Sequence, residues 1–212
     1  MRKVVLASLS NLLMIVIPLL GKPALIIDWK ILLMIAGSIA MWLTQPPVSV
    51  EETNEKQSSD RFSVILILAM SALGVIAPIV DWAYFHDKHD AFNWITFAGI
   101  CTLLFGIYFR AWAVNTLGKF FTATVQIKDD HQLIQGGPYQ IVRHPSYTGA
   151  FLAILSSSMI LNSWIGFIIA FIAMSLAYYV RIGIEERELI GKFQDRYIEY
   201  KKKTKMIIPY VW

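Results

Sequence analysis

The stretch TGAFLAILSSSMILNSWIGFIIAFIAMSLAYYV, from Thr148 to Val180, decides the fold of this chain. It runs for 33 residues without a charged side chain. As one helix it would be ~50 Å long, well beyond the ~30 Å hydrocarbon core of a bilayer, whereas two full crossings need about 40 residues. We therefore predict a tight helical hairpin over 148–180, with two short arms and a turn near Asn162-Ser163.

The hairpin is flanked on both sides by polar residues and residues of restricted shape. Before and into its start runs GGPYQIVRHPSYTG, from Gly136 to Gly149, and Arg181, Glu185 and Glu186 follow its end. A hairpin returns the chain to the face from which it started, so the two flanking segments should meet there. The sequence thus predicts a site at one membrane surface.

A purely structural interpretation covers part of this pattern. Pro145 can occupy the first turn of a helix, where its missing N–H costs nothing, and Tyr147 can anchor at the interface. Arg181 and Glu185 are i,i+4 neighbours on a helix and could simply pair. This interpretation leaves His144 and the segment preceding it without a role.

The composition indicates a membrane protein throughout. Of 212 residues, 56% are hydrophobic and 16% charged, with mean hydropathy +0.54, whereas soluble domains average ~25% charged residues. Three further runs carry no charge: Val4–Leu20, Phe62–Val80 and Ala91–Phe109. We predict an all-α integral membrane protein with about six transmembrane helices. Residues 1–116 would hold four spans and a polar linker at 45–61.

The placement of the basic residues predicts the orientation. If the N-terminus is cytoplasmic, sixteen Lys/Arg lie on inner segments and three, Lys22, Lys30 and Lys88, on outer ones. This bias follows the positive-inside rule, so both termini and the site should be cytoplasmic. The net charge of +4 then reflects topology and attraction to membrane lipids, and nucleic acid is not expected as a partner.

Metal and disulfide chemistry are not expected. Cys101 is the only cysteine and lies in an apolar run, which excludes an internal disulfide and a cysteine-based metal cluster. His86 and His89 are spaced as a metal pair, but they stand in a short aspartate-bearing loop and are interpreted as solvated histidines.

Residues 184–205 are predicted to form an amphipathic C-terminal helix. Leu189, Phe193, Tyr197 and Tyr200 recur at i, i+4, i+8 and i+11, one face of a helix. The charged residues occupy other positions, so this helix should be cytosolic or interfacial.

The second half of the chain resembles the isoprenylcysteine carboxyl methyltransferase family, and more distantly the phospholipid methyltransferases. The resemblance covers roughly 117–203. Its elements are Leu117-Gly-Lys-Phe-Phe, Val125-Gln126, His131-Gln-Leu-Ile134, Gly137-Pro-Tyr139, Arg143-His-Pro-Ser-Tyr-Thr-Gly149 and Arg181-x3-Glu185-Glu-x2-Leu189-x3-Phe193-x3-Tyr197-x2-Tyr200.

This resemblance implies that residues 117–212 bind S-adenosylmethionine without a Rossmann domain. The site would combine a cytosolic loop with the C-terminal helix. Arg181 matches the position that contacts the methyl acceptor. The residues implied to line the cofactor pocket are Gln126, His131, Gln132, Leu133, Ile134, Tyr139, His144, Pro145, Ser146, Tyr147 and Glu185.

The chemistry of methyl transfer to a carboxylate fits these residue types. A carboxylate is ionised at neutral pH, with a reference pKa near ~4, so it needs no general base. An arginine can hold it bidentately. The function implied is methylation of the carboxylate of a lipophilic, isoprenylcysteine-type acceptor that enters from the bilayer. The expected location is the cell membrane in a prokaryote or the endoplasmic reticulum in a eukaryote.

Two alternatives remain open from the sequence. The acceptor could be an amine, hydroxyl or thiol of a phospholipid or other small lipophilic molecule. An amine, however, would call for a carboxylate or an aromatic cage in place of Arg181. The chain could also be a transporter or scaffold, although its charge-free spans lack the ionisable residues of a coupled carrier, and no internal repeat is evident.

Overall fold

The computed structural model describes residues 2–45, 58–86, 92–121 and 132–208. The described residues form helices and one isolated β-bridge, with no strand. Three helices are long and apolar enough to cross a membrane: α4 (Ser58–Phe85), α5 (Trp94–Leu117) and α7 (Trp164–Phe193). The all-helical membrane fold is confirmed. Most of the predicted linker at 45–61 lies outside the described residues.

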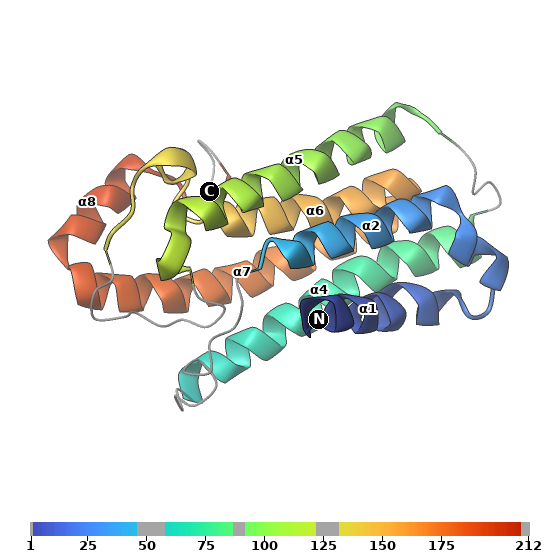
Figure 1. Ribbon diagram of the computed structural model, residues 1–212, viewed down its shortest axis with the longest axis horizontal. Coiled ribbons are helices and arrows are strands. Elements are labelled where there is room, and N and C mark those ends of the chain that lie inside the picture. The colour runs from blue at the N-terminus through green and yellow to red at the C-terminus, as the bar shows by residue number, and fades with distance from the viewer. Residues whose placement is uncertain (1, 46–57, 87–91, 122–131, 209–212) are drawn as a thin grey trace.

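Shorter apolar helices complete the bundle, which Figure 1 shows as an elongated stack. They are α1 (Arg2–Asn11) with the turns η1 (Leu12–Val16) and η2 (Ile17–Leu19), η3 (Pro23–Ile27), α2 (Trp29–Leu43) and α6 (Pro145–Leu161). Two short turns, η4 (Gly118–Phe120) and η5 (Gly137–Gln140), and helix α8 (Asp195–Lys203) lie at one end. Among the described residues, three helices are long enough to be membrane spans, so the count of about six spans remains a prediction.

The predicted hairpin turn is present between α6 and α7. Asn162 ends α6 in the left-handed conformation (φ 57°), which asparagine tolerates. Ser163 starts α7, and its Oγ accepts a hydrogen bond from the Gly166 N–H at 3.0 Å. Pro145 occupies the first turn of α6, as its missing N–H allows.

The arms of the hairpin differ from the prediction. The second arm is a helix of 30 residues rather than a short one. No proline stands between Val180 and Gln194, so the backbone stays helical from apolar into polar sequence until Gln194, where φ is +48°. The single helix predicted over 184–205 was therefore wrong: its first part is the end of α7, and its second part is α8.

Helices α5 and α6 cross in close contact because glycines meet at the crossing. A Cβ added at Gly149 would lie 2.5 Å from the Gly106 carbonyl oxygen, and one added at Gly106 would lie 2.7 Å from the Gly149 oxygen. Small residues allow such approach of helix backbones in membranes. Gly149, the last residue of the RHPSYTG sequence, thus allows α6 to pack closely against α5.

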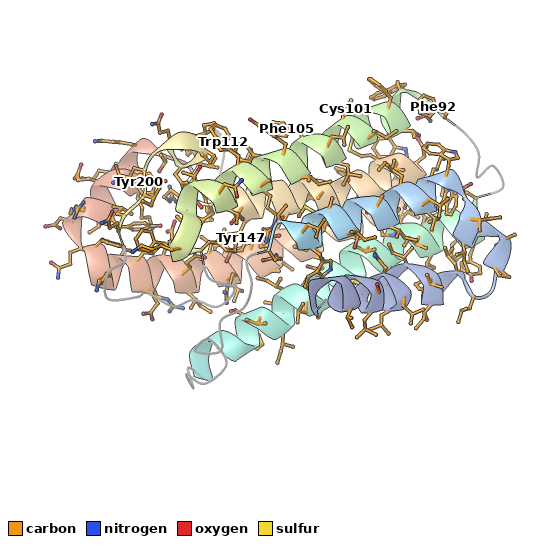
Figure 2. The ribbon with its side chains drawn as sticks, viewed as in Figure 1. Phe92, Cys101, Phe105, Trp112, Tyr147 and Tyr200 are labelled. Atoms are coloured by element: carbon orange, nitrogen blue, oxygen red, sulfur yellow. The ribbon has the colours of Figure 1, made fainter. Side chains whose placement is uncertain are left out.

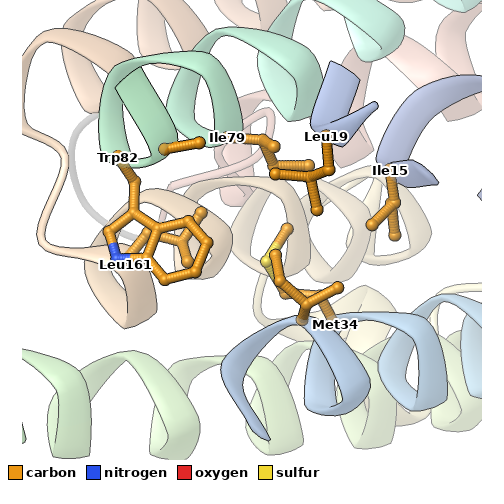
Figure 3. Packing of buried hydrophobic residues seen from close by; sticks show 8 residues of the cluster. Ile15, Leu19, Met34, Ile79, Trp82 and Leu161 are labelled. Atoms are coloured by element: carbon orange, nitrogen blue, oxygen red, sulfur yellow. The ribbon is translucent and has the colours of Figure 1, made fainter. Parts of the chain in front are cut away.

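Two apolar clusters hold the remaining helices. The first joins η1, η2, α2, α4 and the end of α6, and Figure 3 shows Trp82 and Ile79 of α4 facing it together with Leu19 and Ile15. The second joins α6 and α7 and also takes in Ile207 from the end of the chain. Many other large apolar side chains are exposed on the outside of the bundle, as is usual for membrane helices. Figure 2 shows Cys101, Phe105 and Trp112 along the outer side of α5.

Candidate active site

The site lies at the polar end of α7, a helix longer than the hydrocarbon core of a bilayer is thick. At 1.5 Å per residue, the 30 residues of α7 span ~45 Å, about 15 Å more than a hydrocarbon core. Its first 17 residues are uncharged, and the charged part begins at Arg181. Figure 1 shows η5 and α8 gathered around this projecting end.

Tyr147 joins Arg181 and Glu185. The Tyr147 hydroxyl donates to Glu185 Oε2 at 2.9 Å and accepts from Arg181 Nε at 3.2 Å. The two flanks of the hairpin therefore meet, as the sequence predicts. The Tyr147 hydroxyl of α6 therefore connects Arg181 with Glu185, the two residues for which the sequence suggested a direct i,i+4 pair.

His144 lies between two carboxylates. Its Nε2 is 3.3 Å from Glu186 Oε1, and its Nδ1 is 3.7 Å from Glu185 Oε1. The histidine is 4% exposed, whereas the Glu185 side chain keeps 30% exposure. Glu185 thus presents a carboxylate at the edge of the cluster, and His144 presents a ring beside Tyr147, at 5.8 Å between centroids.

Glu186 joins the RHPSYTG loop to the end of the chain, a role that the sequence reasoning missed. Its Oε1 accepts from Arg143 Nε at 2.7 Å, and its Oε2 accepts from Lys201 Nζ. Arg143 also donates to the backbone carbonyl of Lys201 in the last turn of α8 and to that of Thr204, which caps this helix. The adjacent Glu-Glu pair and the arginine of the motif were the available signal, but which glutamate meets which cation depends on the helix rotation.

A short parallel pairing reinforces this junction. Val142 forms a β-bridge with Lys205. The Arg143 N–H donates to the Lys205 carbonyl at 2.8 Å, and the His144 N–H donates to the Met206 carbonyl at 3.1 Å. The backbone position of His144 therefore depends on a segment 62 positions later in the chain.

Three buried tyrosines lie on the side of the site that faces α8. Tyr139 is buried, and its carbonyl accepts a hydrogen bond from the Tyr200 hydroxyl at 2.6 Å. Burial raises the pKa of the Tyr139 phenol, so it stays protonated at neutral pH. The Tyr197 hydroxyl is buried without a hydrogen-bond partner among the described residues, and burial, together with the charges of Glu186 and Glu185, raises the pKa of that phenol as well.

Arg110 of α5 is a second cation that the sequence reasoning did not assign to the site. It is 6% exposed; Nη1 donates to the Ser146 carbonyl at 2.9 Å and Nε donates to Thr44 Oγ1 at 3.2 Å. Its guanidinium also lies 5.9 Å from the centre of the Phe121 ring. All these partners are neutral, so Arg110 has no counter-ion among the described residues, and a buried charge without one is costly. The signal was a lone arginine in a helix that otherwise carries no charge.

The other predicted cofactor residues divide into described and undescribed ones. Pro145 and Ser146 are buried in the first turn of α6 beside His144. Gln132 is exposed and Leu133 and Ile134 are half-buried in the segment that leads to η5. Gln126 and His131 lie outside the described residues. Over the described ranges, no three His, Cys, Asp or Glu side chains are grouped as metal ligands would be.

Comparisons with known proteins point to one family. A sequence profile of the isoprenylcysteine carboxyl methyltransferase (ICMT) family matches residues 98–191. The chain is 34% identical over 152 residues to protein-S-isoprenylcysteine O-methyltransferase of Saccharomyces cerevisiae, covering 68% of this chain and 63% of that protein. It is 30% identical over 148 residues to protein-S-isoprenylcysteine O-methyltransferase B of Arabidopsis thaliana, covering 69% and 73%.

A solved structure is similar over nearly the whole chain. It is that of a eukaryotic intramembrane Ras methyltransferase, ICMT, with a TM-score of 0.65 and 25% identity over 99% of this chain and 75% of that one. The chain spans under two thirds of the length of the Saccharomyces relative. Because the solved structure matches 99% of this chain, the structural likeness includes the N-terminal helices, which lie outside the matched profile.

Proposed function

Since the chain belongs to the isoprenylcysteine carboxyl methyltransferase family, we propose that it transfers the methyl group of S-adenosylmethionine to the carboxylate of an isoprenylcysteine-type acceptor. One observation carries the proposal. Tyr147 bonds both Glu185 and Arg181, so a group suited to a cationic donor and a group suited to an anionic acceptor lie on either side of one phenol.

The residues present suit the donor. When bound, S-adenosylmethionine supplies an electrophilic methyl group on a sulfonium cation. The carboxylate of Glu185, partly exposed beside His144, would balance the positive charge of this molecule. The rings of Tyr147 and His144 offer faces to a cation or a nucleobase. The buried Tyr197 hydroxyl, which lacks a partner among the described residues, is a donor of the kind a bound polar ligand satisfies.

Gln126, His131, Gln132, Leu133, Ile134, Tyr139, Pro145 and Ser146 remain our proposal for the rest of the donor pocket. Their roles follow from the resemblance of the motif.

Two buried arginines suit the acceptor. Arg181, 3% exposed, would hold the acceptor carboxylate. Arg110, which donates a hydrogen bond to the Ser146 carbonyl next to Tyr147, would supply a second positive charge. A carboxylate needs no deprotonation at neutral pH, so these residues act by positioning it and replacing its water. The low dielectric around the buried guanidinium groups strengthens their attraction for the anion.

The acceptor's apolar part would lie in the bilayer. The site sits at the end of the membrane helices, so a lipophilic acceptor entering sideways brings its carboxylate to Arg181 while the donor enters from the aqueous side. The positive-inside bias makes that side cytoplasmic.

The experiment that tests the function is methyl transfer in native membranes with radiolabelled S-adenosylmethionine. Base-labile label on an S-isoprenylated cysteine acid supports a methyl ester. Base-stable label on a lipid amine would instead identify an N-methyltransferase. If the purified, folded protein, incubated with both substrates, gives no labelled acceptor, the proposal is refuted.

A further inference from the structure

Ser63 links the N-terminal half of the chain to the site. It lies near the start of α4, outside the residues 98–191 that match the family profile. Its side chain is fully buried, and its Oγ accepts a hydrogen bond from Arg181 Nη1 at 2.8 Å. The two residues are 118 positions apart in sequence, so this contact exists only because α4 packs antiparallel to α7.

The Arg181 guanidinium thus donates hydrogen bonds to side chains of two other helices. Ser63 of α4 accepts from Nη1, and Tyr147 of α6 accepts from Nε. Arginine is a long side chain with many rotamers, and a bidentate contact with a carboxylate requires its plane in one orientation. Two acceptors on different nitrogens determine that plane before any acceptor arrives.

The position of Ser63 relative to α7 is itself well determined. Farther along α4, a Cβ added at Gly74 would lie 2.9 Å from Ile154 Cγ2 and 3.6 Å from Ala170 Cβ, so α4 contacts both arms of the hairpin closely. Ile67 and Met70 of α4 pack against the buried cluster of α6 and α7. A helix held at this distance presents the Ser63 hydroxyl at a constant place.

We propose that Ser63 is a positioning residue for the acceptor carboxylate, acting through Arg181. The proposal rests on the acceptor-binding role given to Arg181 above. It makes α4 part of the acceptor site, although this helix carries none of the family's motif residues.

The test compares two ligands that differ only in the carboxylate. The probes are N-acetyl-S-farnesylcysteine and its carboxamide, each titrated into the full-length protein in detergent with S-adenosylhomocysteine present. The variants are Ser63→Ala, Ser63→Thr, Arg181→Ala and the control Ser71→Ala. Ser71 is on the same helix and bonds Met174 Sδ of α7 at 3.7 Å, so its loss perturbs the same helix pair away from the arginine.

Ser63→Ala should reduce the preference for the acid over the amide about tenfold, the usual effect of one hydrogen bond to a charged group. Affinity for the amide and for S-adenosylhomocysteine should change less than twofold. Ser63→Thr, which keeps the hydroxyl, should restore most of the preference, and Ser71→Ala should leave it unchanged. Loss of packing alone would weaken acid and amide binding equally.

The outcomes separate the two proposals. If Arg181→Ala abolishes the acid preference but Ser63→Ala keeps it, the role of Ser63 is refuted and that of Arg181 stands. If Arg181→Ala keeps the preference, the acceptor role of Arg181 is wrong and the inference about Ser63 falls with it. A Ser63→Ala protein that loses acid and amide affinity alike would likewise overturn the positioning role.

Discussion

Glu186→Gln removes the negative charge that joins the RHPSYTG loop to the end of the chain. Glu186 is 5% exposed and faces three basic side chains, Arg143, His144 and Lys201. Without this charge, the Arg143 guanidinium, whose side chain is 8% exposed, has only neutral acceptors left among the partners described. We expect the pairing of 142–144 with 205–206 to loosen.

The size of this effect follows from the burial of the partners. Breaking a buried ion pair by removing one partner costs about 3–5 kcal/mol. Lys201 keeps 36% of its side chain exposed and can turn to water, and Arg143 keeps two carbonyl acceptors. We therefore place the loss at the lower end, about 3 kcal/mol, which corresponds to roughly 100-fold in the local opening equilibrium.

Backbone amide hydrogen exchange measures this opening directly. The amides of Arg143 and His144 donate to the carbonyls of Lys205 and Met206, so their protection should fall about 100-fold in Glu186→Gln. Affinity for S-adenosylhomocysteine should fall as well, because His144 is held through the same contacts. The control is Glu188→Gln, an exposed glutamate on the same helix. Equal protection in the two variants would refute the reasoning.

Three further predictions follow from the site and the helix crossing. Arg181→Ala should abolish methyl transfer while S-adenosylhomocysteine still binds; equal loss of both would contradict its acceptor role. His144→Ala and Glu185→Ala should each weaken donor binding about tenfold or more in calorimetry in detergent, by loss of a charge-assisted contact, and unchanged binding would remove them from the pocket. Gly149→Val should destabilise the protein by roughly 1–3 kcal/mol in thermal unfolding, through overpacking against Gly106; wild-type stability would mean that the helices separate freely.

The membrane class and the hairpin were predictable because they depend on local sequence. A charge-free run can be compared with the bilayer thickness without knowing any contact, and Asn162-Ser163 is a turn by its own chemistry. The return of Arg181 and Glu185 to the side of Tyr147 follows from the hairpin alone. The donor residues, by contrast, came from resemblance, and Gln126 and His131 lie outside the described residues.

The boundaries of the C-terminal helices were not predictable in the same way. Polarity changes at Arg181, but helical backbone continues as long as nothing stops it, and the stop at Gln194 carries neither proline nor glycine. The apolar face of Leu189, Phe193, Tyr197 and Tyr200 was identified correctly as a pattern. It is divided between two helices that turn relative to each other.

By itself, the sequence therefore determined that this is a membrane protein and that its polar segments on both sides of the hairpin return to one face. What only the tertiary structure decided is which of those polar groups meet. Ser63 accepts a hydrogen bond from Arg181, Glu186 accepts one from Arg143 and Glu185 accepts one from Tyr147. Among the described residues, Arg110 has only neutral partners. The physical reason is that hydropathy acts residue by residue, whereas a hydrogen bond needs two atoms within about 3 Å, and that distance depends on how whole helices pack.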